Sequence, residues 1–325
     1  MAREAAVQKF DPAAKALSID WGFPVAGRQA QRWAQGLGGV LVTRRDREVK
    51  EHKRGQRPCG PKNEPVLLVI GLDGGRVQGK DKDESSGSRW REDKVATLTS
   101  YLPGDGKEKE PEALVTTTVA TMRDAAAFGP MVRVEAERRG VRQAAVILAI
   151  CDGGNWIDPL LEKHFGLLTR IIDWCHASEH LWTCAKAAYG PGTPQAAQHA
   201  ELWEAWLWDG QTQRVIAALQ SESDRLGQVQ TSDAPEHPRR ILAQNVGYFT
   251  RHQNHMRYPE YRARGWPIGS GVTEAAVKQF NKRVKGTEQF WHEKTVEPIL
   301  MLRAAWISQD ERWDKYWANR PAYLN

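Results

Sequence analysis

Two apolar runs of eight residues constrain the fold most, because the same triplet, Asp-Gly-Gly, follows each of them. The first run spans Pro65–Leu72 and precedes Asp73, and the second spans Ala144–Cys151 and precedes Asp152. A short, continuous apolar run rich in β-branched residues is typical of a strand that is buried on both faces of a sheet. The sequence therefore predicts two central strands of a mixed α/β sheet, each followed by an acidic turn.

Other periodic patterns predict the neighbouring elements. Arg89–Tyr101 alternates in polarity and predicts one or two strands, and Leu167–Ile172 predicts a further strand. Helices are expected at Glu112–Phe128 and Ile157–Phe165. From Ala177 to Tyr261 the strand pattern gives way to amphipathic helices, so we expect this stretch to be entirely helical.

The N-terminal fifth of the chain has a different character. Residues 1–42 have the pattern of short helices, and Pro24–Trp33 could form the second half of a helix-turn-helix. One short amphipathic helix packs against a core more often than it reads DNA, so packing is the alternative. Residues 43–65 are polar and basic and contain Gly and Pro, which predicts a linker.

Positive charge is concentrated in two segments. The net charge is +6 and the sequence pI is about 9.1. Thr43–Lys62 carries eight Lys or Arg residues against three acids, and Lys278–Lys285 carries four basic residues and no acid. Clustered positive charge suits a polyanion such as DNA. A solvated linker and an ordinary surface helix would explain the same charges.

Neither export nor membrane insertion is expected from the sequence. Its apolar runs fall short of the ~18 residues that span a bilayer, and the N-terminus has no apolar signal segment. The four cysteines form no Cys-x-x-Cys pair, which indicates a reduced protein without a disulfide framework. We expect a cytoplasmic, nucleoid-associated protein.

The Asp-Gly-Gly triplets place acids at the ends of strands, where open α/β folds bind ligands. Asp73 and Asp152 offer short, ionised, hard-oxygen ligands that suit magnesium or manganese. The glycines would let a phosphate chain pass close to the backbone. Because Asp-Gly is also a common turn pair, two ordinary turns are the alternative.

A third carboxylate, Glu274, follows a Gly-Ser-Gly loop. Ser270 or Thr273 can cap a helix that starts near Val272, which puts Glu274 in the first turn, near the positive helix end. At ~100° per residue, one side of this helix groups Glu274 with Lys278, Asn281, Lys282 and Lys285. A second side is apolar and is made by Ala276, Val277, Phe280 and Val284. A surface helix with an unremarkable Glu is the alternative.

Three such carboxylates can hold two divalent ions ~4 Å apart. In this interpretation one ion activates a water or a 3'-hydroxyl for in-line attack on phosphorus, and the other stabilises the leaving oxygen. The stripe of Lys and Asn residues would position phosphates without reading bases. The three carboxylates are Asp73, Asp152 and Glu274, and the predicted cofactor is a pair of Mg or Mn ions.

Four motifs occur together along the chain. They are Leu72–Val77, Asp152-Gly153, Asp173–Leu181, and Gly269–Gly271 with Glu274 and Lys278. This set resembles the bacterial insertion-sequence DDE transposases, most closely the ISKra type of the Mutator-like group, and the resemblance covers about Val66–Trp317. It implies an RNase H-like mixed sheet with an all-α insertion between the second Asp and the Glu, preceded by a short helical N-terminal region.

The resemblance also implies a division into four regions. They are a helical N-terminal region with a basic linker (1–64), the first part of the RNase H-like core (65–180), the all-α insertion (181–262), and the second part of the core with the catalytic helix (263–325). The implied catalytic and metal-binding triad is Asp73, Asp152 and Glu274. The implied partners are transposon-end and target DNA, bound by a homodimer.

Asp173 and His176 match the Asp-x-x-His signature of the same group and are expected to support the site. His176 would contact the scissile phosphate or shuttle a proton. His176, His180 and Cys184 are spaced i, i+4, i+8 and could form a zinc site. The alternative is a polar patch that steadies the helix against the active site.

Aromatic and basic residues around the Glu274 helix complete the predicted DNA surface. Trp266 and Trp291 flank the helix and could stack on unpaired bases, with ordinary packing as the alternative. Trp291 also matches a recurrent aromatic of the resembled group. The predicted DNA-binding residues are Lys278, Asn281, Lys282, Arg283, Lys285, Trp266 and Trp291.

The activity that these features favour is metal-dependent DNA cleavage at insertion-sequence ends, followed by strand transfer from the freed 3'-hydroxyl. Two alternatives stay open from the sequence. One is a non-catalytic or domesticated DNA-binding protein derived from a transposase. The other is an RNase H-like nuclease that cleaves but does not join.

Overall fold

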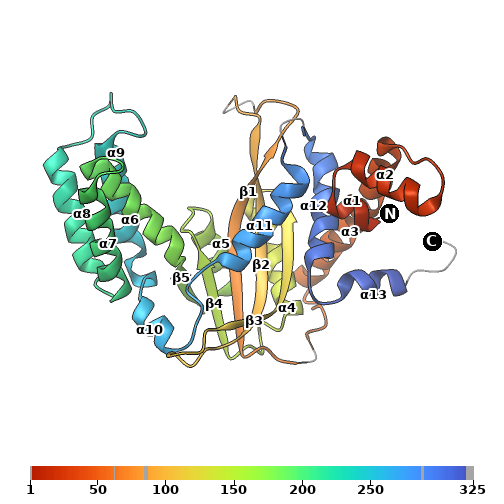
Figure 1. Cartoon of the computed structure of the whole chain (residues 1–325). Helices are drawn as coiled ribbons and strands as arrows, with labels where there is room; N and C mark the ends of the chain where they lie inside the picture. Colours follow the sequence, from red (N-terminus) through yellow and green to blue (C-terminus); the bar gives the residue numbers. More distant parts are fainter. Residues whose placement is uncertain (1, 62, 84–86, 287–288, 320–325) are drawn as a thin grey trace.

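A computed structural model describes residues 2–61, 63–83, 87–286 and 289–319. Within these residues the chain forms a five-stranded sheet of order β3-β2-β1-β4-β5 (Figure 1). Its strands are β1 (Leu67–Gln78), β2 (Trp90–Leu102), β3 (Glu112–Thr121), β4 (Val146–Cys151) and β5 (Thr169–Ile172). β2 is antiparallel to β1 and to β3, whereas β4 is parallel to β1 and to β5. The prediction of a mixed α/β sheet is confirmed, and the two apolar runs form its adjacent strands β1 and β4.

The register between β1 and β4 determines where the sheet opens. Their parallel pairing runs from Leu67 opposite Val146 to Leu72 opposite Cys151. β4 ends at Cys151, but β1 continues alongside β2 as far as Gln78. The second half of β1 therefore has an edge that β4 does not cover, up to Gln78, which accepts the backbone N–H of Trp291.

The prediction that residues 73–75 form a turn is wrong, because this triplet lies inside β1. Side chains of β2 occupy the space beside both glycines. A Cβ added to Gly74 would lie 2.5 Å from Oε1 of Glu92, and one added to Gly75 would lie 2.5 Å from Oδ1 of Asp93. Here the missing side chains make room for neighbours across the sheet and do not reverse the chain.

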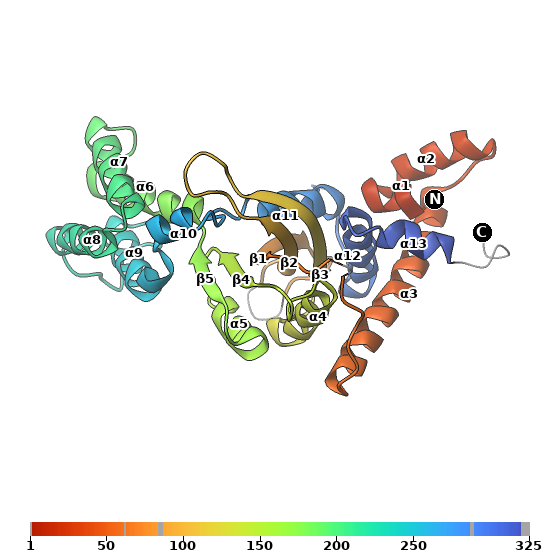
Figure 2. The ribbon, with the colours of Figure 1, turned by 90° about the horizontal axis from the view of Figure 1, so that it is seen from below.

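Helices cover both faces of the sheet (Figure 2). One face packs against α4 (Ala125–Arg138) and α5 (Ile157–Phe165), and the other packs against α11 (Gly271–Val284) and α12 (Glu293–Ile307). Because side chains alternate along a strand, Leu68, Ile70 and Leu72 of β1 all join the core under α4 and α5. The intervening residues of β1 face the side that carries α11.

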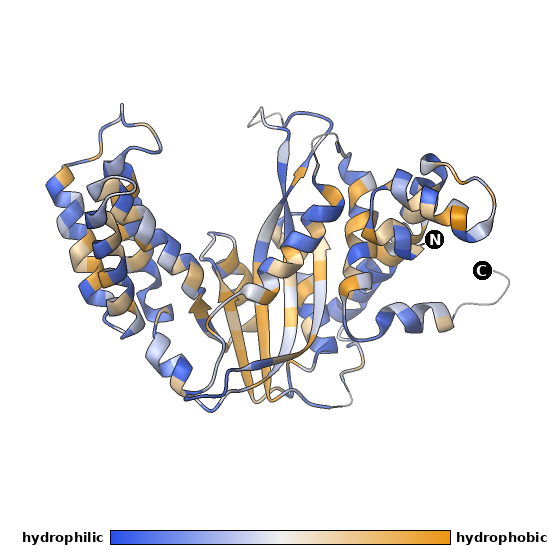
Figure 3. Ribbon diagram, viewed as in Figure 1, coloured by the Kyte–Doolittle hydropathy of each residue, from blue (hydrophilic) through white to orange (hydrophobic). Residues whose placement is uncertain are grey.

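The stretch after β5 is helical, as predicted, and it extends from one end of the sheet (Figure 1). Its elements are α6 (Trp174–Tyr189), α7 (Pro194–Trp208), α8 (Thr212–Leu226), α9 (Pro238–His252), the 3-10 helix η1 (Gln253–His255) and α10 (Tyr258–Ala263). Trp203, Leu219 and Phe249 are buried in a core that continues into the sheet through Leu148 and Ile150. Figure 3 shows hydrophobic colour concentrated on the strands and mixed colour on these helices. No helix in the described part of the chain is both long and apolar enough to cross a membrane.

The expected linker at residues 43–65 is wrong over its first half. After α1 (Ala2–Val7) and α2 (Phe10–Trp21), the single helix α3 runs from Gly27 to Lys53. Arg, Lys and Glu are good helix formers, and the segment is supported by ion pairs at i,i+4 spacing, such as Arg44 with Glu48 at 3.1 Å. The helix expected at Pro24–Trp33 is the start of this longer helix, which packs against α12.

A second correction concerns the helix expected at Glu112–Phe128. Glu112–Thr121 forms the strand β3, and α4 begins only at Ala125. The β-branched run of Val and Thr residues favours a strand, and the side chain of Asp124 caps α4 by accepting the backbone N–H of Ala127 at 2.8 Å. Arg89–Tyr101, expected as one or two strands, is the single strand β2.

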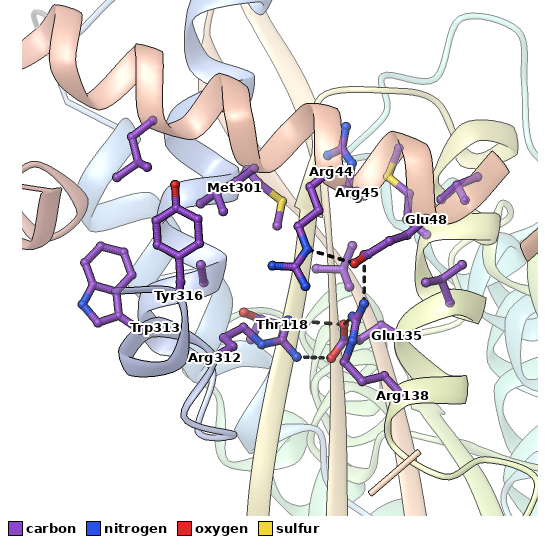
Figure 4. A pocket seen from close by; sticks show the side chains of 17 residues that line it. Arg44, Arg45, Glu48, Thr118, Glu135, Arg138, Met301, Arg312, Trp313 and Tyr316 are labelled. Atoms are coloured by element: carbon purple, nitrogen blue, oxygen red, sulfur yellow. Dashed lines mark hydrogen bonds and ion pairs between the residues drawn. The ribbon is translucent and has the colours of Figure 1, made fainter. Parts of the chain in front are cut away.

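The two ends of the chain are tied to the sheet around a hollow of about 120 Å³ between α3, α4, α12 and the C-terminal α13 (Arg312–Ala318) (Figure 4). Glu135 of α4 is buried and accepts from the guanidinium groups of Arg312 and Arg138, and Arg138 also reaches Glu48 of α3 at 2.8 Å. Burial acts to raise the pKa of Glu135, but the two arginines outweigh it and lower the pKa to about 2. The buried carboxylate of Glu135 is therefore ionised and neutralised by the arginines around it.

The Glu297 carboxylate should contribute strongly to stability, because it joins α12 to both α3 and β3. It accepts from Arg45 at 2.7 Å, from the hydroxyl of Thr121 at 2.7 Å and from the backbone N–H of Met122 at 2.8 Å. We expect Glu297→Ala to lower the free energy of unfolding by about 2–4 kcal/mol, measured by urea denaturation. Glu293→Ala in the same helix removes an exposed carboxylate and should cost at most about 1 kcal/mol. Equal losses would contradict the assignment.

Candidate active site at the end of the parallel strand pair

Asp73 and Asp152 lie side by side because of the strand register. The β1–β4 pairing ends with Leu72 opposite Cys151, and each aspartate is the next residue on its own strand. Each carboxylate is held locally by a glycine: the N–H of Gly74 donates to Asp73 Oδ1 at 2.6 Å, and the N–H of Gly154 donates to Asp152 Oδ1 at 2.9 Å.

Glu274 reaches the same place because α11 packs closely on β1. Gly71 lies two residues before Asp73 and so on the same face of the strand. A Cβ on Gly71 would lie 1.8 Å from the Thr273 hydroxyl, which in turn bonds the Thr97 hydroxyl of β2 at 2.7 Å. Thr273, expected as a helix cap, instead fastens the first turn of α11 to the sheet, and Glu274 is the next residue.

The three carboxylates line one pocket of about 190 Å³. The residues around it are Leu72, Asp73, Cys151, Asp152, Cys175, His176, Glu179, Ser270 and Glu274. A second hollow of about 410 Å³ adjoins it and shares Asp73 and Asp152. As placed, no three His, Cys, Asp or Glu side chains in the described residues form a coordination group for a metal. Glu274 Oε2 instead contacts the Lys278 ammonium at 3.3 Å.

The pKa of Asp73 is raised by its surroundings. Burial is the largest cause, and the charges of Asp152 and Glu274 add to it; the Gly74 N–H and the His176 ring oppose the rise, and the resulting pKa is about 6. Asp93, opposite Gly75 and on the same face of the sheet, was missed by sequence reasoning. It is fully buried, neither of its oxygens has a hydrogen-bond partner within the described residues, and burial raises its pKa to about 6. This is an acidic region that a cation would stabilise.

Asp173 connects the start of α6 to the start of α11. Its Oδ1 accepts the backbone N–H of His176 at 2.7 Å, and its Oδ2 accepts the backbone N–H of Ser270. The residue is only 2% exposed. Since Ser270 directly precedes α11, Asp173 fixes the helix that carries Glu274, and its own side chain does not line the carboxylate pocket.

The geometry favours the polar patch over the zinc site at His176, His180 and Cys184. Cys184 is buried in the apolar core, where burial raises the pKa of its thiol to about 12. His180 bonds Asn245 at 2.5 Å and stacks on Tyr248 with ring centroids 4.1 Å apart. His176 lies against His180 and lines the carboxylate pocket.

Most of the predicted basic stripe on α11 is exposed. Lys278 and Lys282 face solvent, and Lys285, also exposed, lies just past the helix end. Its ammonium is 5.4 Å from the centroid of the Trp90 ring. Asn281 is half-buried, with an Oδ1 atom that has no partner among the described residues.

Arg283 and Trp291 are wrong as DNA-binding residues, because both are buried. Arg283 is 0% exposed, and its Nε donates to the Ala5 carbonyl at 2.8 Å while its guanidinium covers Phe10. Trp291 is 8% exposed, and its indole N–H donates to the Val284 carbonyl at 2.8 Å. They fasten α11 to the N-terminal helices and to the loop that follows it.

Trp266 also supports the packing alternative. It is half-buried against the core of the helical block and stacks on Tyr261, with ring centroids 6.2 Å apart. It lines neither the carboxylate pocket nor the adjoining hollow.

Sequence reasoning missed three further residues around the carboxylates. The Tyr248 hydroxyl donates to the backbone carbonyl of Asp152 at 3.0 Å, so α9 of the helical block touches the pocket. Arg76 and Trp90 line the adjoining hollow. No local signal marks Tyr248. The other two could have been found only from the register that places Gln78 opposite Trp90.

Comparison with known proteins does not identify a family for this chain. No protein-family model and no curated protein matches the chain. Among solved structures, the "Drosophila P element transposase strand transfer complex" is similar, with a TM-score of 0.39 and 10% sequence identity over 96% of this chain and 92% of that chain. At that TM-score the likeness carries no argument about fold or activity.

The raised pKa of Asp73 predicts a substitution that stabilises the protein. Because the folded state holds this proton more tightly than the unfolded chain, stability is lost as the pH rises from about 4 through 6. At pH 8 we expect Asp73→Asn to raise the free energy of unfolding by about 1–3 kcal/mol, and the gain should fade below pH 6. Asp105→Asn is the control with opposite sign, since three backbone N–H groups lower the pKa of Asp105. Chemical denaturation at pH 8 and at pH 4 measures the effect of each substitution. A gain for Asp73→Asn that persists at pH 4 would refute the explanation.

Removing the Asp173 carboxylate should disturb both helix starts that it joins. We expect Asp173→Ala to lower the free energy of unfolding by about 2–3 kcal/mol, because one cap and one buried N–H partner are lost. Asp124→Ala removes the cap of α4 alone and should cost about 1 kcal/mol. Thermal and urea denaturation of the two variants provide the comparison. Indistinguishable losses would show that the contact with Ser270 contributes nothing.

Proposed function

We propose that this chain is a DNA transposase of the DDE type that cuts and joins DNA strands with divalent metal ions. The observation that carries the proposal is the pocket shared by Asp73, Asp152 and Glu274, which come from β1, the end of β4 and the first turn of α11. Three hard-oxygen ligands that converge from distant parts of a chain suit a two-ion phosphoryl-transfer site.

The proposal includes an RNase H-like core. Support comes from the mixed sheet of order β3-β2-β1-β4-β5, with carboxylates on adjacent central strands and a third on a helix that returns to the same face. In this assignment, residues 65–180 and 263–325 form the core, residues 181–262 form the insertion, and residues 1–64 precede them. The proposal extends to the ISKra type of insertion-sequence transposases, on the strength of the motif set alone, and to a homodimer that acts on paired DNA ends.

The chain's own residues suit divalent ions at this place. Asp73, Asp152 and Glu274 would hold two Mg or Mn ions, and the pKa of Asp73, raised by burial and by the charges of Asp152 and Glu274, indicates a place where added positive charge would stabilise the carboxylates. When bound, the ions supply a nucleophile at neutral pH and stabilise the leaving oxygen. Asp173 and Tyr248 position the ligands through Ser270 and the Asp152 carbonyl.

Positive charge beside the pocket would bring the DNA backbone to the carboxylates. Lys278, Lys282 and Lys285 are exposed along or just beyond α11, next to Glu274. These ammonium groups suit phosphates and carry no base specificity. His176 lines the pocket with a partly exposed ring, so it can contact a phosphate oxygen.

Loss of any one carboxylate should abolish catalysis while the fold persists. We expect Asp73→Asn, Asp152→Asn and Glu274→Gln each to reduce Mg²⁺-dependent cleavage at least about 100-fold. The substrate is a plasmid that carries the coding sequence with its native flanks. Glu179→Gln is the matched control, because this exposed acid lines the same pocket without belonging to the triad. Pre-cut ends test joining separately.

The outcomes separate the candidate functions. Cleavage that survives in all three triad variants would refute the proposal. Salt-sensitive DNA binding without cutting in the wild type would instead identify a non-catalytic DNA-binding protein, and cutting without joining would identify a nuclease. As a readout independent of activity, Mg²⁺ should raise the Tm of the wild type but not that of a variant carrying both Asp73→Asn and Asp152→Asn.

A further inference from the structure

The hollow next to the carboxylate pocket lies along the edge of β1 that β4 does not cover. It exists because β4 stops at Cys151 while β1 continues to Gln78; within the described residues no named strand pairs with this part of β1, although Gln78 at its end accepts the backbone N–H of Trp291 at 2.9 Å. Its lining residues are Asp73, Gly74, Gly75, Arg76, Trp90, Arg91, Glu92, Asp152 and Trp156. Because Asp73 and Asp152 line both hollows, a molecule in this one lies directly beside the proposed site of phosphoryl transfer.

Trp90 presents a large aromatic surface in this hollow. It is the first residue of β2, and its side chain is 39% exposed. The Lys285 ammonium lies 5.4 Å from its ring centroid, which puts a positive charge beside anything that stacks on the indole. Next to Trp90 in the chain, Arg89 lies over a second exposed ring, with its guanidinium 5.5 Å from the ring centroid of Phe290. Exposed aromatic rings flanked by cations are the features that bind unpaired bases.

Arg76 supplies an unneutralised cation in the same hollow. It is exposed, and its side chain makes no hydrogen bond or ion pair within the part of the chain that the structure describes. The neighbouring cations differ, since Arg91 pairs with Glu293 and Lys94 pairs with Glu92. A guanidinium with free donors suits a phosphate, which it can bind through two parallel hydrogen bonds.

We infer that this hollow binds an unpaired nucleotide next to the scissile phosphate, with its base stacked on Trp90 and its phosphate contacted by Arg76. A base inside a duplex has both faces covered by its neighbours, so a stacking site for an indole beside the scissile phosphate favours DNA whose end is splayed or single-stranded. The inference rests on the proposed function, because it takes the carboxylate pocket as the place of cleavage. It replaces Trp291 and Trp266, the aromatic residues expected from the sequence, with one that lines the site.

Binding of labelled oligonucleotides tests the inference without relying on catalysis. Fluorescence anisotropy would compare a blunt duplex with the same duplex carrying unpaired bases at one 3' end, at fixed salt and with Ca²⁺. We expect the wild type to prefer the splayed end. Trp90→Ala should weaken binding to the splayed end about tenfold and leave blunt binding unchanged within about twofold, whereas Trp90→Phe should retain most of the preference.

Two further variants sharpen the test. Trp208→Ala is the matched control, because this indole is 37% exposed and covered by Arg262 at 3.7 Å, yet lies in the helical block and lines neither hollow. It should bind both DNAs as the wild type does. Arg76→Ala should weaken both complexes and reduce the slope of log affinity against log salt by about one.

A wild type without preference for the splayed end, or a Trp90→Ala variant that keeps the preference, would overturn the inference. Circular dichroism spectra of all variants ensure that a loss of binding is not a loss of fold. Failure of the proposed function has a different signature, namely a wild type that never cleaves DNA with Mg²⁺. A protein that cleaves normally but binds both ends equally would remove only the role given to Trp90.

Discussion

The parallel pairing of β1 with β4 is the constraint on which the candidate site depends. Both strands are apolar on both faces, so burial fixes their register, and a slip by one residue would turn every side chain to the opposite face. With Leu72 held opposite Cys151, Asp73 and Asp152 become neighbours at the point where β4 ends. The same ending leaves the edge of β1 open, so one feature of the register creates both the carboxylate pocket and the hollow beside it.

The position of the third carboxylate, Glu274, depends on close backbone contacts at the start of α11. Thr273 occupies the space that a side chain at position 71 would need, so α11 can approach β1 this closely because residue 71 is glycine. Asp173 fixes the same helix start through Ser270. The Glu274 carboxylate is held by neither contact; within the described residues it is paired with exposed Lys278 and, at 3.4 Å, with the Ser270 hydroxyl. The backbone beneath it is therefore rigid, whereas the carboxylate is free to reorient toward a ligand.

Local pattern was sufficient for elements whose partners are nearby or generic. The apolar runs of β1 and β4 and the amphipathic helix α5 were predicted because burial alone determines them. Prediction from the local pattern failed where a residue's environment is set by a partner far away in the sequence. Arg45 lies in a helix, α3, that is held partly by its ion pair with Glu297. Arg283 is buried and donates to the carbonyl of Ala5, at the other end of the chain. A basic or aromatic residue has the same local signal whether it faces DNA or such a partner, so Arg283 and Trp291 were wrongly placed on the DNA surface.

The distribution of charge also bears on how the proposed site would work. Phosphates are repelled by the cluster of Asp73, Asp152 and Glu274, and of the cations nearby, Arg76 and the lysines of α11, Lys278 is paired with Glu274. Divalent ions would remove that repulsion, and bound phosphate would in turn add ligands and negative charge for the ions. Binding free energies are reciprocal, so the proposed function requires DNA and metal to increase each other's affinity. Because the pKa of Asp73 is raised to about 6, protons would compete with the ions for this carboxylate below that pH, whereas at neutral pH it is mostly ionised and ready to serve as a ligand.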